Sequence, residues 1–212
     1  MKDIVSVIRE ICEPENGFAD LFNQKKSYSL LSSKAEQEDA YLFGKLLYGK
    51  ARKNLIEMIK DSYQYEKFSS LILEDLQADG LTAPQAISAL EIFFKAFGYP
   101  GYRDALQNPV SEFISYDSGN FKIKHKGETK NGKEYGIGRR DNFYEGKSCG
   151  FDECNWIDGR MLGYCYSLEV EMEAFETKKY GFVLNDCYVG KYMLVYEDGT
   201  EEYMIGKPFP VQ

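Results

Sequence analysis

The change of hydrophobic periodicity near residue 110 constrains this chain most. Over the first hundred residues apolar side chains recur at helical spacing, whereas residues 121–126 alternate with a period of two, as a half-buried strand does. Ten of the 17 tyrosines lie beyond residue 110, among frequent glycines and polar turns. We therefore predict an α+β protein, with an N-terminal helical bundle followed by a mainly antiparallel β domain.

The helical half is predicted from apolar spacing and from helix-end signals. The clearest helix begins at Thr82, where a capping hydroxyl, a first-turn proline and Gln85 at the capping-box position coincide. It ends at Gly98, the glycine expected just past a helix. This end resembles the end of a small helical module of bacterial multidomain proteins, and a generic bundle is the alternative. Two further apolar helix faces are Ile4, Val7, Ile8 and Ile11, and Tyr41, Leu42, Leu46 and Leu47.

The composition of turns sets the expected domain boundaries. Residues 1–102 are predicted as the helical domain and residues 121–212 as the β domain. The stretch between them, residues 103–120, contains turn chemistry at Gln107-Asn108-Pro109 and again at 115–120. No helical face persists there, so we predict a linker over residues 103–120.

The β domain contains a segment that looks like a repeat unit. Residues 125–138 place Gly127, Asn131, Gly132, Gly136 and Gly138 in a spacing that resembles one MORN repeat, with a histidine in place of the usual aromatic residue. Weaker copies are expected at residues 144–146 with 156–165, and at residues 190–203, with insertions between them. The resemblance implies stacked hairpins and a scaffolding role in protein association. A non-repetitive β-barrel or sandwich is the alternative.

Three pairs of residues predict the tight hairpin turns of this domain. They are Asn131-Gly132, Asp158-Gly159 and Asp198-Gly199. Such pairs favour two-residue turns between antiparallel strands, because both residues tolerate a positive φ.

Charge limits the classes of partner. The formal net charge is −8, from 26 basic and 34 acidic residues, and both halves are mildly acidic. We therefore expect no nucleic-acid binding, which depends on neutralising phosphates, and no attraction to anionic membranes. Charged residues interrupt the apolar residues of the first ten positions, and no run of 18 apolar residues occurs. We expect no signal peptide, no membrane span and a cytoplasmic location.

The side chains suited to catalysis or metal binding are few. His125 is the only histidine and lies in a charged, alternating stretch, so we expect it to face solvent rather than to act in catalysis. Cys149, Cys154, Cys165 and Cys187 could bind zinc together, but their spacing is not that of a zinc knuckle. With Cys12 they are expected to be free thiols. We predict no catalytic residue, no cofactor and no metal.

Aromatic side chains are the remaining binding candidates. Tyrosine and tryptophan bury a large area at interfaces at modest entropic cost. The candidates for an aromatic binding face are Trp156, Tyr135, Tyr144, Tyr164, Tyr166, Tyr192 and Tyr196, and we expect Trp156 to be partly exposed. The alternative is that most of them form the core of the β domain.

The first functional hypothesis is a non-catalytic, cytoplasmic interaction or scaffold protein with a protein partner, whose helical half docks or forms a homo-oligomer. The alternative is an acidic stoichiometric inhibitor, such as an immunity or anti-defence protein, of a basic enzyme. An enzyme of unknown class is third.

Overall fold

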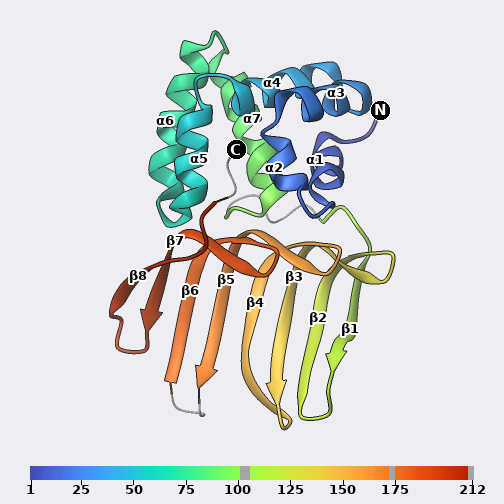
Figure 1. The fold of residues 1–212 in the computed structure, drawn as a ribbon, viewed down its shortest axis with the longest axis vertical. Helices are drawn as coiled ribbons and strands as arrows, with labels where there is room; N and C mark the ends of the chain where they lie inside the picture. Colours follow the sequence, from blue (N-terminus) through green and yellow to red (C-terminus); the bar gives the residue numbers. More distant parts are fainter. Residues whose placement is uncertain (101–105, 172–174, 210–212) are drawn as a thin grey trace. The chain divides into compact units, whose positions relative to one another are not determined.

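A computed structural model describes residues 1–100, 106–171 and 175–209 and divides the chain into two compact units (Figure 1). The helical unit contains residues 1–97 together with Phe209, and the β unit contains residues 98–208. The predicted α+β class, with helices first and antiparallel strands second, is confirmed. Residues 103–105 of the predicted linker and residues 210–212 of the predicted β domain lie outside the described residues.

The helical unit is built from short amphipathic helices around an apolar core. In the described residues its elements are α1 (Ile4–Cys12), α2 (Gly17–Leu21), α3 (Gln24–Lys34), α4 (Gln37–Tyr48), α5 (Arg52–Lys60), the 3₁₀ turn η1 (Ser62–Gln64), α6 (Tyr65–Ala78) and α7 (Ala83–Phe97). No helix among these residues has the length and apolarity that a membrane crossing requires.

Helix α7 has the ends that the sequence predicts. The Gln85 side-chain oxygen accepts the Thr82 backbone N–H at 3.0 Å, and the Thr82 hydroxyl accepts the Gln85 N–H at 3.5 Å. This reciprocal pair satisfies two backbone donors that a helix start leaves free. At the other end Gly98 has a φ of +67°, the left-handed conformation that terminates a helix.

An aromatic cluster in the helical unit includes a residue from the far end of the chain. The Phe18 ring lies 5.4 Å from the Phe97 ring and 5.4 Å from the Phe209 ring, both in edge-on geometry. The Phe22 ring lies 5.6 Å from the Phe18 ring and 6.0 Å from the Phe209 ring. The chain therefore leaves the helical unit after α7, forms the β unit, and returns to the helical unit at Phe209.

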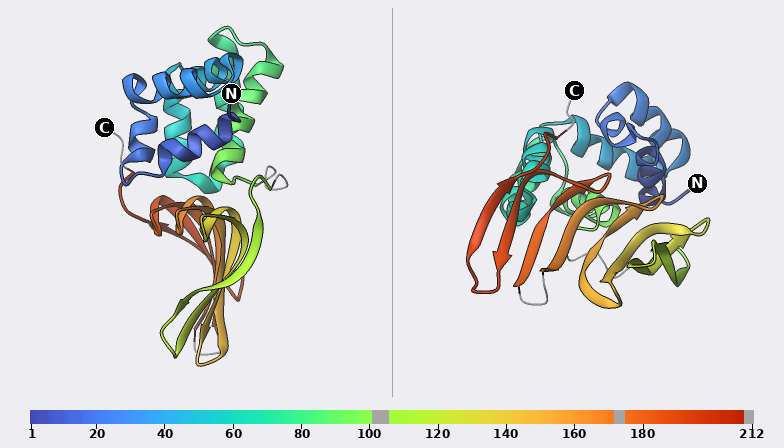
Figure 2. Two further views of the ribbon diagram at one scale, coloured as in Figure 1. Left: turned by 90° about the vertical axis from the view of Figure 1, so that its right-hand side faces the viewer. Right: turned by 60° about the horizontal axis from the view of Figure 1, so that its bottom comes forward.

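The β unit is one antiparallel sheet in which every strand pairs with the next in sequence. Its strands are β1 (Val110–Asp117), β2 (Phe121–Lys130), β3 (Lys133–Tyr144), β4 (Lys147–Ile157), β5 (Arg160–Glu171), β6 (Phe175–Leu184), β7 (Cys187–Tyr196) and β8 (Glu201–Ile205). They form a single, curved, open layer with β1 and β8 at its edges (Figure 2). The closed and two-layered alternatives considered from the sequence are therefore wrong for the described residues.

Strand β1 lies inside the stretch predicted as a linker. Its apolar residues Phe113, Ile114 and Tyr116 do not alternate regularly, because the register of its pairing with β2 shifts between Ile114 and Tyr116. This bulge disrupts the period-two pattern from which a strand is recognised in sequence. The sheet therefore begins before residue 121, the predicted start of the β domain.

Two-residue turns recur at a constant interval along the sheet. Asn131-Gly132, Asp158-Gly159 and Asn185-Asp186 all have positive φ at both positions, and they follow one another every 27 residues. A positive-φ glycine follows each turn at the same offset, at Gly136, Gly163 and Gly190. The hairpin therefore repeats every 27 residues without insertions.

The turn predicted for the third copy of the repeat is wrong. The sequence pattern assigned its turn to Asp198-Gly199, which joins β7 to β8, whereas the equivalent turn is Asn185-Asp186, which joins β6 to β7. The turn at 185–186 contains no glycine, so it lacked the signal by which the other two were found. Asparagine and aspartate adopt the left-handed conformation more readily than other residues with a side chain, which explains their presence here.

Gly150 offers a test of the close strand approach in this sheet. Its φ is +126°, and a Cβ there would lie 1.9 Å from the Leu168 carbonyl oxygen, whereas Gly146, with φ +80°, has no neighbouring atom within 4 Å of such a Cβ. Gly150→Ala should lower the free energy of unfolding by about 3–5 kcal/mol, because backbone strain and steric overlap add. Gly146→Ala should cost only about 1 kcal/mol. Urea titration of both variants measures the difference, and equal losses would contradict the predicted overlap.

Candidate functional site

The register of the sheet aligns one residue from each of the eight strands in a single row on one face. The row runs from β1 to β8 through Glu112, Lys126, Arg139, Glu153, Tyr166, Tyr180, Met193 and Tyr203. Directly paired residues of antiparallel strands point to the same side of the sheet. Its first four members are charged and its last four are aromatic or apolar. The face therefore changes character from ionic to aromatic across the sheet.

The aromatic half of this face contains three rings in continuous contact, which we name the aromatic ladder: Phe151, Tyr166 and Tyr180. The Phe151 and Tyr166 rings meet edge-on at 5.4 Å, and the Tyr166 and Tyr180 rings stack at 4.9 Å. All three side chains are half-buried. The Arg139 guanidinium lies 3.7 Å from the centre of the Phe151 ring, in cation–π geometry.

The ionic half of the same face borders a hollow of about 380 Å³, which we name the sheet hollow. Leu106, Val110 and Ile137 supply its apolar lining, and Lys126 and Arg139 stand among its other lining residues. Leu106 and Val110 are more than half exposed. Arg139 pairs with Asp141 at 2.7 Å and with Glu153 at 3.3 Å, whereas Lys126 has no ion pair within the described ranges. The hollow thus offers an apolar surface beside a lysine that forms no ion pair in the described part of the chain.

The predicted exposure of Trp156 is wrong, because this residue is fully buried on the opposite face of the sheet. Its indole N–H donates to the Gly138 carbonyl at 3.0 Å, and the Arg140 guanidinium covers its ring at 4.0 Å. Gly138 creates the space, since a Cβ there would lie 3.3 Å from the indole. Trp156 therefore contributes to the interior and offers no surface to a partner.

The other predicted binding residues do not form one face. Tyr135 and Tyr164 are buried, and Tyr144 is exposed near the end of β3. Tyr166 belongs to the aromatic ladder, whereas Tyr192, stacked on Tyr188 at 4.6 Å, lies on the opposite side of the sheet. Tyr196 is also on that opposite side and is partly exposed.

Sequence reasoning missed Phe151 and Tyr180, whose rings contact Tyr166, and Arg139, whose guanidinium covers Phe151. The 27-residue interval is a signal for part of this set, because it relates Arg139 to Tyr166 and Glu153 to Tyr180.

His125 is also buried, so the expectation that it faces solvent is wrong. Its ring packs edge-on against Trp156 at 6.0 Å and lies 5.5 Å from the Phe113 ring. Its Nε2 lies 3.3 Å from the Glu128 carbonyl oxygen, to which it donates in the Nε2–H tautomer, while Nδ1 has no hydrogen bond in the described part of the chain. Burial lowers the pKa of His125, opposed by the bond to the Glu128 carbonyl. The lysines on both sides point the other way, which made the stretch look solvent-facing.

Glu128 is a fully buried carboxylate that binds backbone amides. It accepts the N–H groups of Gln107 and Ile137, and the Asn108 backbone N–H at 2.7 Å. The Asn108 side-chain amide donates to it as well, at 3.2 Å. A carboxylate with this number of donors is stable in the interior without a cation. It fixes the segment that precedes β1 onto β3.

All five cysteines are free thiols. Cys12, Cys154 and Cys165 are buried, and burial raises the pKa of Cys12 well above its ordinary value. The described residues contain no cluster of three or more His, Cys, Asp or Glu side chains that could hold a metal ion.

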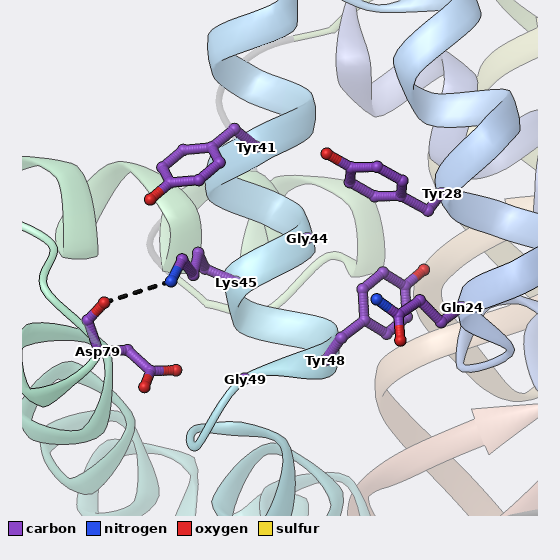
Figure 3. A pocket seen from close by; sticks show the side chains of 8 residues that line it. All are labelled: Gln24, Tyr28, Tyr41, Gly44, Lys45, Tyr48, Gly49 and Asp79. Carbon is purple, nitrogen blue, oxygen red and sulfur yellow. Dashed lines mark hydrogen bonds between the residues drawn. The ribbon is translucent and has the colours of Figure 1, made fainter.

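The helical unit contains a separate pocket between α3 and α4, with a volume of about 260 Å³ (Figure 3). Tyr41, Gly44, Lys45 and Tyr48 of α4 line it at the spacing of one helix face, and Tyr28 faces them from α3. Figure 3 shows Tyr41 and Tyr28 on the two sides of the α4 backbone at Gly44. We name this site the tyrosine pocket.

Comparison with known proteins does not identify the chain, since no protein-family model matches it and no curated protein matches it significantly. The resemblance of residues 125–138 to a MORN repeat therefore stays a prediction.

Replacing Glu128 tests its role as an acceptor of backbone amides. Glu128→Gln keeps the shape but turns one of the two acceptor oxygens into a donor, so at least the N–H group of Ile137, or those of Gln107 and Asn108, loses its acceptor. The free energy of unfolding should fall by about 2–4 kcal/mol, measured by urea titration. Glu145→Gln, in an exposed turn, is the control and should change stability by less than about 0.5 kcal/mol. A neutral result at Glu128 would contradict the proposed role.

His125 should make the stability depend on pH. Because its pKa is lowered in the folded state, the unfolded chain takes up the proton first as the pH falls below the ordinary value of 6.5. The contribution of His125 to the free energy of unfolding should be constant above pH 6.5. Below that pH it should decrease until the pH reaches the lowered pKa of His125 in the folded state. Since His125 is the only histidine, His125→Gln should remove this decrease. Melting temperatures from pH 7.5 to pH 5.5 measure it, and an unchanged slope in the variant would contradict the assignment.

Proposed function

We propose that the protein is a non-catalytic interaction or scaffold protein whose β unit binds a protein partner through the aromatic ladder and the sheet hollow. The observation that carries the proposal is the ladder of Phe151, Tyr166 and Tyr180, half-buried on one face of a single-layer sheet and continued by Arg139. Tyrosine and arginine are the residue types that most often dominate the energetics of protein interfaces. A MORN-like array of hairpins supports the same role.

The dimensions of this face suit a protein partner. With strands about 4.8 Å apart, the row from β2 to β8 extends over about 29 Å. A patch of that length can supply the roughly 800 Å² that each partner contributes to a stable interface. The ladder offers a flat aromatic surface, and the sheet hollow accepts an apolar anchor side chain beside Lys126. A cytoplasmic location and a docking or oligomerising role of the helical half belong to the same proposal.

The inhibitor alternative is favoured by the net charge of −8. An acidic protein associates rapidly with a basic partner through long-range attraction. The two hypotheses differ in their partners, because an inhibitor binds one basic enzyme in a one-to-one complex and a scaffold binds several unrelated proteins.

The proposal is tested by affinity capture from native cytosol with the wild-type protein and with Tyr166→Ser combined with Tyr180→Ser. We expect the double variant to lose the captured partners by at least about tenfold, because each truncated ring removes an anchor of the interface. Mass spectrometry and native mass measurement give the identity and stoichiometry of what remains bound.

Tyr196→Ser is the matched control, because Tyr196 is partly exposed on the opposite side of the sheet. It should retain the partners within about twofold. Thermal melting of each variant verifies that the fold is retained. Equal capture by the double variant and by the control would overturn the assignment of the ladder as the interface.

A further inference from the structure

Two large aromatic side chains of the tyrosine pocket stay exposed on either side of a glycine, an arrangement that packing of the helical unit does not explain. Tyr28 and Tyr41 are 42% and 47% exposed, although each ring is large enough to be a core residue. Gly44 lies between them in the middle of α4, where glycine costs about 1 kcal/mol relative to alanine. A Cβ at Gly44 would lie 3.1 Å from the Tyr28 ring, so the glycine keeps the floor of the pocket open.

The pocket presents hydrogen-bond donors that the protein does not use. The hydroxyls of Tyr28 and Tyr41 and the side-chain amide of Gln24 have no hydrogen bond within the described residues. Tyr48 is different, because its hydroxyl donates to the Leu21 carbonyl at 3.1 Å and also bonds Ser27. Tyr48 therefore forms a fixed wall, and the other three side chains are available to a ligand.

Lys45 adds a positive charge beside Asp79, another lining residue, with which its ammonium group forms no ion pair. Its ammonium group donates to the Asp79 backbone carbonyl at 3.3 Å and lies 5.7 Å from the centre of the Tyr41 ring. The Asp79 carboxylate turns away to Lys50, accepting its backbone N–H at 2.9 Å and pairing with its ammonium at 3.7 Å. Within the described ranges Lys45 has no ion pair, so its charge favours an anionic group on the ligand.

We propose that the tyrosine pocket binds an extended, proline-containing segment of a partner protein that carries an acidic residue beside its prolines. Proline offers a carbonyl acceptor but no N–H donor, and an extended proline segment has no internal hydrogen bonds. Its carbonyl groups match the free donors of Tyr28, Tyr41 and Gln24. Its rings pack on tyrosine faces, as in other aromatic-lined grooves, and its carboxylate meets Lys45. The ammonium of Lys45 opposes the binding of cationic ligands.

The test uses the full chain and two fluorescent nonapeptides that consist of proline except for the central residue, which is glutamate in one and glutamine in the other. Fluorescence anisotropy should show saturable binding of the glutamate peptide with a Kd between about 10 µM and 500 µM. Tyr41→Ala and Gly44→Val should each weaken it by at least about fivefold. Lys45→Gln should weaken the glutamate peptide by about fivefold and leave the glutamine peptide within about twofold.

The control is Tyr63→Ala, which removes a partly exposed tyrosine elsewhere in the helical unit and should leave both affinities within about twofold. Three outcomes overturn the proposal. They are the absence of saturable binding up to about 2 mM peptide, equal weakening of both peptides by Lys45→Gln, and equally tight binding of a glutamate nonapeptide without proline. The site is distinct from the aromatic ladder, so the ladder variant should bind these peptides normally. Failure here leaves the function proposed for the sheet unaffected.

Discussion

The β unit depends on a backbone constraint: a two-residue turn in which both residues have positive φ. Such turns match the twist of antiparallel strands and fix their register. Because the turn at Asn131-Gly132 recurs every 27 residues, each interval advances the chain by two strands and returns equivalent positions to the same row. From β1 to β7 the composition of this row is therefore set by two positions of the repeat, those of Lys126 and Arg139. Substitutions at these positions convert an ionic row into an aromatic one.

The two faces of this single-layer sheet differ in how far their aromatic rings are buried. On one side, Trp156 and His125 are buried with the help of Gly138, whose missing side chain gives both rings their space. On the other side the rings of the aromatic ladder remain half-buried, because they contact one another across strands rather than a second layer. The first face stabilises the unit, and the second retains surface that a partner can bury.

The sequence was sufficient to predict the features that depend on residues close together in the chain. The capping box at Thr82, the stop at Gly98 and the turn at Asn131-Gly132 each involve residues close in the chain. Features that depend on neighbouring strands were not predictable in this way. The burial of Trp156 depends on Gly138, 18 positions earlier, and the contact of Phe151 with Tyr166 depends on register. Tyr41 was assigned to an apolar helix face because its spacing alone does not distinguish core from pocket.

The position of Phe209 after the sheet means that the helical unit cannot be completed before the β unit has been synthesised. The aromatic cluster of Phe18, Phe22 and Phe97 acquires its last ring only after the whole sheet has been synthesised. Contacts between residues so far apart in sequence are slow to form, because a long loop must close first. During translation the helical segments therefore emerge first, and the Phe18 and Phe22 rings lack their Phe209 partner until residue 209, which follows β8, has left the ribosome. The sheet is therefore inserted between the two segments of the chain that form the helical unit.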